Sequence, residues 1–381
     1  MQERISNLDF IRGVAVLGIL IMNSRFFAMP KSAYNNISTA GAENFIDWSI
    51  LIFSQLFIAE KFMGLFSILF GASIVLFIDA AKKKERKNPR LLSLWRNFLL
   101  LIFGGIHAFF WVGDVLTVYA SCALIVIILH NRSLKLLIFL SLLLTCFGAI
   151  IAPLFQMLFD DQGNLISSAK ESFTDGKGLS GYWFDDSKEM GEAIGSFWGL
   201  DAIGRALGMM LLGVVLYRLS ILQGTKEKIF YKKLVYIFLP IGIILTSINI
   251  IWLSIENYHP SIAVISTTPL KLAIIPMCLG YIGLLSILNK NISKKISIYL
   301  RSCGRMAFTN YITQTILCFI FIKGIFQNHN FSILEISAFI LFVWFLQLFW
   351  SKFWLEKFKY GPLEWLWRKL TYINSQFKIY Q

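Results

Sequence analysis

The sequence predicts an all-α, polytopic bundle of about ten membrane-spanning helices, with both ends of the chain in the cytoplasm and a short helix at the outer interface. Hydrophobic residues make up 56% of the 381 positions, charged residues only 15%, and the mean hydropathy is +0.65. Apolar stretches of ~18 residues or more recur along the chain, each long enough to cross a hydrocarbon core of ~30 Å. The charged residues lie mostly between these stretches.

The spanning helices are predicted from the apolar stretches in chain order, with boundary errors of ~2 to 4 residues. An even number of crossings returns the chain to its starting side, and without a fixed repeat or a soluble segment we expect a single integral membrane domain over residues 1–381. The predicted helices cover residues 8–28, 61–80, 92–111, 114–130, 134–157, 197–217, 234–254, 267–288, 304–324 and 332–352.

Basic residues near the helix ends predict the orientation, because Lys and Arg resist translocation. The four basic segments all fall on one side of the predicted bundle, which is therefore the cytoplasmic side: Lys82–Arg96, Arg218–Lys233, Lys290–Arg305 and Lys352–Lys378. Residues 355–381 then form a cytoplasmic tail. The net charge of +14 is explained by topology, so we expect membrane lipids as partners and no nucleic acid.

Two segments are predicted to lie on the outer side. Residues 158–196 form the longest loop, and residues 44–60 are apolar but too short for a separate span, which favours an interfacial helix. The loop is acidic, with Asp160, Asp161, Asp175, Asp185, Asp186, Glu189 and Glu192.

Polar side chains inside the first predicted helix form one stripe. An ionisable group at the bilayer centre costs at least ~2.5 to 3.5 kcal/mol, so such residues face the bundle interior or a wet cavity. Asp9 and Arg12 are three residues apart, and Asn23 follows Arg12 by eleven residues, nearly on the same helical face. The stripe is a candidate binding face; equally, Asp9 and Arg12 could pair at the interface and only set the topology.

The strongest catalytic candidate is His107 in the third predicted helix. It lies eleven residues beyond Arg96 and therefore on the same face, deeper in the membrane. The turn at residues 111–114 brings Asp114 back toward it, and a carboxylate beside an imidazole fixes the tautomer that general base catalysis needs. The alternative is a buried histidine that serves only packing.

Further polar groups lie in the sixth and ninth predicted helices. Asp201 and Arg205 are an i,i+4 pair that either contacts a substrate or pairs structurally, and we expect both to line one outer-half cavity with the Asp114 face. The ninth helix is predicted to open at Gly304 and Arg305 and to carry a stripe with Asn310 and Gln314, which is either a binding face or interhelical hydrogen bonding. The five cysteines lack metal-ligand spacing, so no metal is predicted.

Five blocks of sequence, from one end of the chain to the other, carry a family resemblance. They are LDFIRGVAVLGILIMN at 8–23, FMGLFSILFGA at 62–72, GGIHAFFWVGDVLTVYA at 104–120, GRMAFTNYITQT at 304–315 and GPLEWLWRKLT at 361–371. In these blocks the chain resembles the bacterial YeiB-like membrane proteins, grouped under a domain of unknown function numbered 418.

The resemblance implies a relation to the wider superfamily of transmembrane acyltransferases, which transfer acyl groups from cytoplasmic acyl-CoA to sugars or other acceptors. The first helix of the best-known branches of that superfamily ends in a His where this sequence has Asn23. His107 is then the best remaining base. Some family members have also been described as transport proteins.

Three functions follow as hypotheses. In the first, a bacterial inner-membrane acyltransferase, Arg12 and Arg96 bind the phosphates of acyl-CoA, His107 oriented by Asp114 deprotonates an acceptor hydroxyl, and Asn23 donates to the oxyanion. The acceptor would be a glycan or a lipid-linked hydroxyl, with acyl-CoA as a substrate and no permanently bound cofactor. The second is a transporter whose polar stripes form a path, and the third is a non-catalytic scaffold or sensor. The oligomeric state is left open.

Overall fold

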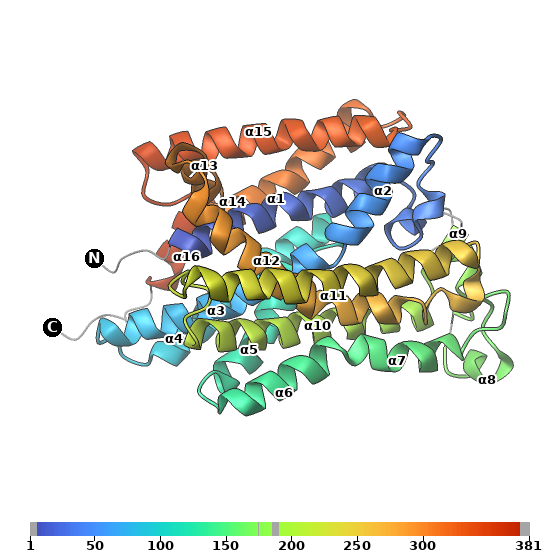
Figure 1. Cartoon of the computed structure of the whole chain (residues 1–381), viewed down its shortest axis with the longest axis horizontal. Coiled ribbons are helices and arrows are strands. Elements are labelled where there is room, and N and C mark those ends of the chain that lie inside the picture. The colour runs from blue at the N-terminus through green and yellow to red at the C-terminus, as the bar shows by residue number, and fades with distance from the viewer. Residues whose placement is uncertain (1–5, 174, 185–189, 374–381) are drawn as a thin grey trace.

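A computed structural model describes residues 6–173, 175–184 and 190–373 as a bundle of helices whose axes run roughly along its length (Figure 1). Among these residues no β-strand forms, and the extended contact between Phe159 and Leu165 is a single bridge. The all-α polytopic prediction is confirmed. The start of helix α1 and helix α16 lie at the same end of the bundle, as the predicted topology requires (Figure 1).

Nine helical stretches among the described residues are long and apolar enough to cross a membrane. They are Ser6–Ala28 (α1), Phe45–Lys83 (α2 and α3), Pro89–Phe110 (α4), Leu134–Gln156 (α6 and α7), Glu192–Arg218 (α10), Lys228–Ile255 (α11), Thr267–Asn291 (α12), Ala307–Ile325 (α14 and η4) and Ile333–Lys357 (α15). Nine of the ten predicted spans are thereby found.

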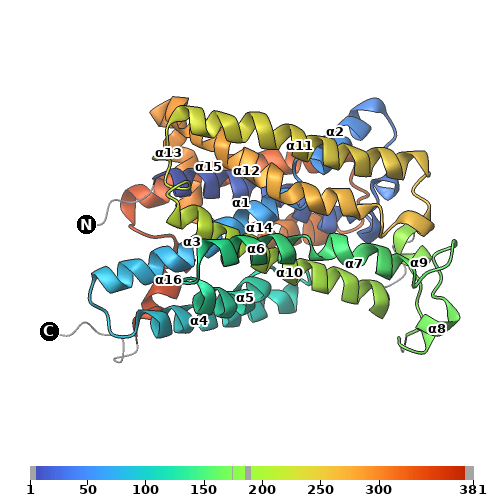
Figure 2. The ribbon, with the colours of Figure 1, turned by 60° about the horizontal axis from the view of Figure 1, so that its bottom comes forward.

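The tenth predicted span is shorter than expected. Over residues 114–130 the chain forms α5, Leu116–Leu129, and its 14 residues extend only ~21 Å at 1.5 Å per residue. Residues 111–115 are not helical, because Asp114 turns the chain and holds the first turn of α5 from outside the helix. α5 packs antiparallel against α4 within the bundle (Figure 2).

Two predicted helices are corrected. The span predicted over 134–157 is broken at Cys146 into α6 (Leu134–Thr145) and α7 (Phe147–Gln156). The helix predicted to open at Gly304 begins instead at Ala307, and Gly304 and Arg305 end a separate basic helix, α13 (Lys294–Arg305). A Cβ at Gly304 would strike the carbonyl of Asp9, so the glycine permits α13 to cross α1 closely.

The segment over 44–60 forms α2, Phe45–Phe57, which is separated from α3 (Lys61–Lys83) by a positive φ of 63° at Glu60. Leu51 is buried while Phe45 and Phe53 are exposed, so α2 has one packed and one open face. Its place at the membrane interface stays a prediction. Figure 1 shows it at the end of the bundle opposite α16.

The outer loop contains two short helices, α8 (Ser167–Lys170) and α9 (Ser180–Phe184). Trp183 fixes it to the bundle, because its indole N–H donates to the Tyr258 carbonyl at 2.7 Å. The predicted acidic residues Asp185, Asp186 and Glu189 lie outside the described residues. The described part of the tail beyond 355 includes α16, Pro362–Thr371.

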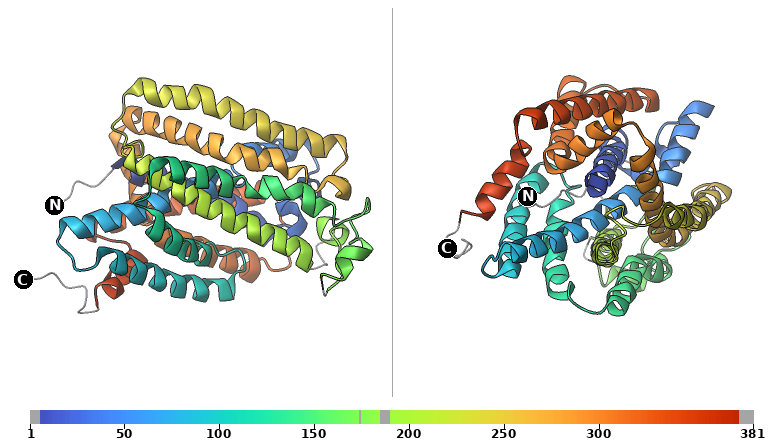
Figure 3. Two further views of the ribbon diagram at one scale, coloured as in Figure 1. Left: turned by 90° about the horizontal axis from the view of Figure 1, so that it is seen from below. Right: turned by 60° about the vertical axis from the view of Figure 1, so that its left-hand side comes forward.

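The interior of the bundle is built around α1 and α10. In the most hydrophobic window of each helix, 72% of α1 residues and 78% of α10 residues are buried, against 17% in α11. α11 therefore presents most of its apolar surface outward, where lipid is the compatible solvent. In Figure 3 α11 pairs with α12 on the outside of the bundle, while α1 is enclosed by its neighbours.

Candidate functional site

A cavity of about 260 Å³ lies at the α13 and α16 end of the bundle. Helices α1, α3, α4, α5, α14 and α16 all contribute to its walls. Its charged lining consists of Arg12, Arg96, Arg305, Glu364 and Arg368, and its other polar groups include Ser73, Ser93 and Asn97. Four arginines against one carboxylate give the lining a positive charge, which favours an anion.

Arg96 is the side chain best prepared for an anion. Its guanidinium lies 3.7 Å from the ring centre of Trp367 and 4.7 Å from that of Phe77, which hold it flat between them. The Trp367 indole N–H also donates to the Arg96 carbonyl at 2.8 Å. Among the described residues, the guanidinium forms no hydrogen bond and no ion pair within 4 Å, although the Glu364 carboxylate of the same cavity attracts it. Its donors are thus available to a ligand.

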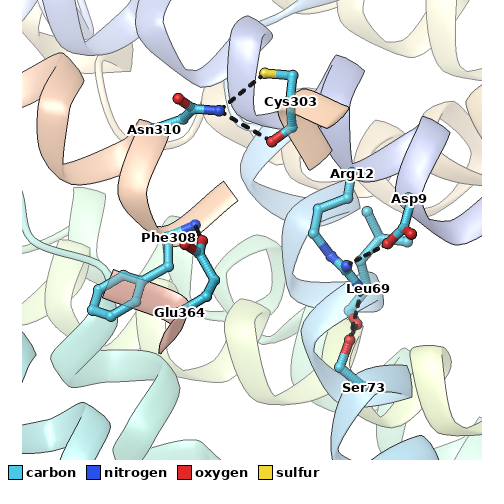
Figure 4. A network of polar contacts seen from close by, with 8 residues as sticks. All are labelled: Asp9, Arg12, Leu69, Ser73, Cys303, Phe308, Asn310 and Glu364. Atoms are coloured by element: carbon cyan, nitrogen blue, oxygen red, sulfur yellow. Dashed lines mark hydrogen bonds and ion pairs between the residues drawn. The ribbon is translucent and has the colours of Figure 1, made fainter. Parts of the chain in front are cut away.

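Arg12 reaches the same cavity from α1 (Figure 4). Its guanidinium donates to Asp9 Oδ1 at 3.1 Å and to Ser73 Oγ at 2.9 Å. The predicted pair of Asp9 and Arg12 therefore exists, and it orients Arg12 without removing it from the cavity wall. The pair can therefore set the membrane topology while Arg12 also binds a ligand in the cavity.

Glu364 joins α16 to the start of α14. Its carboxylate accepts from the amide N–H of Phe308 at 2.8 Å (Figure 4). It also accepts from the Thr309 amide at 3.1 Å and from the Thr309 hydroxyl at 2.6 Å. It therefore caps a helix whose own N-cap residue, Met306, supplies no side-chain bond. Burial raises the pKa of Glu364, and the bonds from Thr309 and Phe308 offset part of that rise.

The inner end of the cavity is closed by tyrosines. Tyr119 accepts a hydrogen bond from Ser67 Oγ at 2.9 Å and donates to the Met63 carbonyl at 3.1 Å. Tyr311 accepts from the Val115 amide at 3.3 Å. Both side chains line the cavity and are buried, with 1% and 2% exposure.

His107 and Asp114 meet directly behind Tyr311. His107 Nδ1 lies 2.7 Å from Asp114 Oδ1, and the imidazole packs edge-on against the Tyr311 ring with centres 5.2 Å apart. Gly104 allows this meeting, because a Cβ there would lie 2.7 Å from the Thr117 nitrogen and push α5 away from α4. The predicted His107 and Asp114 contact is present, although His107 is not part of the cavity wall.

Threonines on either side contact the pair of His107 and Asp114. Asp114 Oδ2 accepts from the Thr117 amide at 2.8 Å and from the Thr117 hydroxyl at 2.9 Å. On the other side of the ring, His107 Nε2 lies 3.0 Å from the Thr315 hydroxyl on α14. The sequence prediction missed Thr315, since a hydroxyl in an apolar helix resembles a packing residue; its only signal was the four-residue spacing from Tyr311.

Asn23 is not brought to this site. It lines neither of the two cavities found among the described residues, and its Nδ2 is buried without an acceptor there. The eleven-residue spacing predicts the face of α1 that Asn23 shares with Arg12, but the helices packed around the outer half of α1 decide what that face meets. Neither of these two cavities is lined by Asn23 or by His107.

Asn310 and Gln314 hold helices together and do not line the cavity. Asn310 Nδ2 donates to the Cys303 carbonyl at 3.1 Å (Figure 4). It also donates to Ser351 Oγ at 2.9 Å. Gln314 Nε2 donates to Gln347 Oε1 at 2.9 Å and to the Val16 carbonyl at 3.0 Å. Of the two readings of this stripe, interhelical hydrogen bonding describes these contacts, whereas Arg305 does line the cavity.

Asp201 and Arg205 belong to a separate ion network in the outer half. Asp201 lies 2.7 Å from the Lys271 Nζ and 3.2 Å from the Arg205 guanidinium, which also meets Glu60 at 2.7 Å. Gly148 makes room for it, since a Cβ there would collide with the Asp201 carboxylate. Neither Asp201 nor Asp114 lines the 260 Å³ cavity, and the common cavity expected for them stays a prediction. Glu60 was missed because its segment was assigned to the interfacial helix.

A second, small cavity of about 20 Å³ adjoins this ion network through Glu60. Its wall includes Gln55 and Asn249, whose side-chain oxygens are buried and without donors among the described residues. The volume is enough for about one water-sized group. Elsewhere in the described residues, no three His, Cys, Asp or Glu side chains gather as a metal site.

Comparison with known proteins places these features in a family. Residues 216–374 match a family model described as "Protein of unknown function (DUF418)". The uncharacterized protein YeiB of Escherichia coli K12 is 30% identical over 389 residues, covering 97% of this chain and 96% of that protein.

Two Bacillus proteins are similarly related. An uncharacterized 39.9 kDa protein of Bacillus acidopullulyticus is 29% identical over 380 residues, with 100% of this chain and 96% of the relative covered. The uncharacterized protein YxaH of Bacillus subtilis 168 is 28% identical over 416 residues, with 98% and 96% covered. The chain thus belongs to the YeiB-like DUF418 family of membrane proteins.

Proposed function

We propose that this protein is a membrane acyltransferase of the bacterial cytoplasmic membrane. It takes an acyl group from cytoplasmic acyl-CoA and transfers it to a hydroxyl of an extracytoplasmic or lipid-linked acceptor. One observation carries the proposal: a four-arginine cavity extends from the basic end of the bundle to the tyrosine layer against which His107 is packed. An anionic donor is thereby brought next to a base.

The arginines suit the phosphates of the donor. Arg forks match phosphate oxygens, and Arg96 has its donors unengaged while stacked between two rings. Since ligand pockets usually measure ~300 to 1,000 Å³, a cavity of about 260 Å³ encloses only part of acyl-CoA. The thioester arm would enter toward Tyr311, and Arg305 and Arg368 would hold the phosphates at the mouth.

His107 supplies the base. The Asp114 carboxylate accepts from the Nδ1–H, which leaves the lone pair of the imidazole on Nε2. In the overall reaction, the acceptor oxygen bonds to the thioester carbonyl carbon, the C–S bond breaks, and the acceptor proton passes through His107 to the leaving thiolate. Asn23 is not included as the oxyanion donor, because it lines neither cavity.

A transporter would use the same arginines as the entrance to a path. The tyrosines that end the cavity, and the separate location of the Asp201 network, favour a site that holds its ligand over a continuous route. The scaffold hypothesis gives no role to the paired His107 and Asp114.

The proposal is tested with the purified protein in proteoliposomes, given radiolabelled acetyl-CoA and the lipid and glycan fraction of a bacterial membrane. Native protein is expected to transfer label to an acceptor, His107→Ala to lose transfer while still binding acetyl-CoA, and Arg96→Ala to lose binding. His130→Gln is the matched control for a buried histidine, and Arg90→Ala is the control for an exposed arginine on the same helix.

The proposal fails if acetyl-CoA and CoA do not bind, or if the His107 variant transfers label at the native rate. Movement of a solute into the liposomes without acyl transfer would support the transporter instead.

A further inference from the structure

The hydroxyl of Thr315 lies where a nucleophile would lie. Its oxygen is 3.0 Å from His107 Nε2, while His107 Nδ1 is 2.7 Å from Asp114. The order hydroxyl, imidazole, carboxylate is that of a nucleophile, its base and the acid that orients the base. All three side chains are buried, with exposures of 4% for Thr315 and 7% for the other two.

The contact is not the usual one for a hydroxyl in a helix. Such groups commonly donate to a carbonyl one turn earlier, as Thr313 does to the Asn310 carbonyl at 3.0 Å. Thr315 points to the imidazole instead. Asp114 also accepts two bonds from Thr117, so it stays an acceptor toward Nδ1–H, and the Nε2 lone pair faces the Thr315 proton.

We propose that Thr315 carries the acyl group as an ester between the donor and the acceptor. The inference rests on the proposed acyltransferase function and specifies its route. The donor cavity ends at Tyr311, one turn before Thr315 on α14, so the next hydroxyl along that helix face is the Thr315 hydroxyl. His107 Nε2 already faces the Thr315 hydroxyl. An acceptor hydroxyl could use the same Nε2 lone pair only after displacing the Thr315 hydroxyl from it.

The two half-reactions balance. First, Thr315 Oγ1 attacks the thioester carbonyl carbon and His107 Nε2 takes the hydroxyl proton; the C–S bond then breaks, and the thiolate takes that proton and leaves as CoA thiol. Second, the acceptor hydroxyl attacks the Thr315 ester and gives its proton to Nε2. The ester C–O bond breaks, and the proton returns to Thr315 Oγ1.

Trp111 packs on the aromatic side of His107, next to the pair of His107 and Asp114. Its ring packs 5.5 Å from the His107 ring and 6.3 Å from that of Tyr311, and its buried indole N–H has no acceptor among the described residues. A buried donor left unpaired costs stability unless a ligand uses it. The Tyr311 ring separates the cavity from Thr315, so it must swing aside for the first step.

The test uses the full-length protein in nanodiscs with acetyl-CoA and no acceptor. Native protein is expected to release about one equivalent of CoA thiol in a burst and to gain one acetyl group, located on the Thr315 peptide by mass spectrometry. Thr315→Val is expected to lose both signals and Thr315→Ser to keep them. Thr313→Val, the same change two residues away, is the matched control and is expected to behave as native.

Acetyl-CoA binding is measured for every variant, which shows that the donor cavity is intact and separates the two proposals. If acetyl-CoA binds and is used with an acceptor, but Thr315→Val transfers at the native rate or the acetyl group lies on another residue, the Thr315 ester is excluded and the acyltransferase stands. Binding without a burst also excludes the ester. If acetyl-CoA does not bind, the proposed function itself fails.

Discussion

At the scale of single residues, polar side chains that have no partner in the protein indicate where a ligand binds. Arg12 is engaged by Asp9 and Ser73, whereas the Arg96 guanidinium packs against two rings and forms no hydrogen bond or ion pair among the described residues. An arginine held flat loses little side-chain freedom when it binds an anion, so its donors contribute more of their energy to affinity. Arg96 is therefore expected to contribute most to donor binding.

Arg96→Lys is expected to weaken CoA binding although it keeps the charge. Lysine lacks the planar fork and the stacking between Trp367 and Phe77, and a charged hydrogen bond is worth ~1.5 to 3 kcal/mol, so the dissociation constant should rise about ten- to a hundred-fold. Isothermal titration of CoA into nanodisc-embedded protein measures it, with Arg90→Lys as the control. Unchanged affinity in the Arg96 variant would contradict this role.

Asp114→Asn is expected to abolish transfer without affecting donor binding. The amide no longer stabilises an imidazolium and can present its NH₂ to Nδ1, which moves the ring proton to Nε2 and removes the base; the rate should fall on the order of a thousand-fold or more. Transfer rate and CoA affinity are measured on the same preparation. A variant that loses affinity and rate together would show that Asp114 only supports the fold.

At the scale of elements, α16 connects the end of the bundle that is predicted to be cytoplasmic with the site. It contributes Glu364, Trp367 and Arg368 to the cavity, and through Glu364 it caps α14, the helix that carries Tyr311 and Thr315. Glu364 is also the single carboxylate among the four cavity arginines. Its protonation therefore changes the charge that a donor phosphate meets.

CoA affinity is expected to depend on pH through Glu364. Because its pKa is raised, the side chain becomes neutral as the pH falls through that value, the net positive charge among Arg12, Arg96, Arg305 and Arg368 increases, and CoA binds more tightly. Glu364→Gln, whose amide oxygen can still accept the bonds from the Phe308 and Thr309 amides, should bind CoA more tightly than native at neutral pH. CoA affinity is measured across pH for the native protein and for the variant, so that protonation of the CoA phosphate, which is common to both, cancels in the comparison. Parallel curves of affinity against pH for the two proteins would refute the effect.

The raised pKa of Glu364 also predicts the direction in which the stability of the fold changes with pH. A carboxyl whose pKa is raised on folding binds its proton more tightly in the folded state, so its contribution is complete below its ordinary value of 4.5 and is lost as the pH rises through the raised value. The native protein should therefore lose stability as the pH rises through this range, and the Glu364→Gln variant should not. Thermal unfolding of both proteins from acid to neutral pH measures it.

At the scale of the whole molecule, hydropathy predicted the spans because lipid demands a long apolar stretch from every crossing. It did not predict the break at Cys146, where both halves are equally apolar, or α13, whose basic residues resemble a loop. For the site, charges inside apolar runs led to His107, Asp114 and Arg96. The role of Thr315 was missed and Asn23 was placed wrongly because both depend on which helices pack together. Spacing along one helix does not contain that information.

The outer half of the bundle is expected to depend on the Asp201 network, which ties α10 to α12 and to the start of α3. Asp201 and Lys271 are both fully buried, so Asp201→Asn leaves the lysine charge without its partner and should cost about 3 to 5 kcal/mol of stability. Replacing both residues by Leu removes the stranded charge and should recover much of that loss. Denaturation in mild detergent measures the series, with the exposed Asp161→Asn as control. If the single and double variants lose stability equally, packing at Gly148, and not the ion pair, holds this region together.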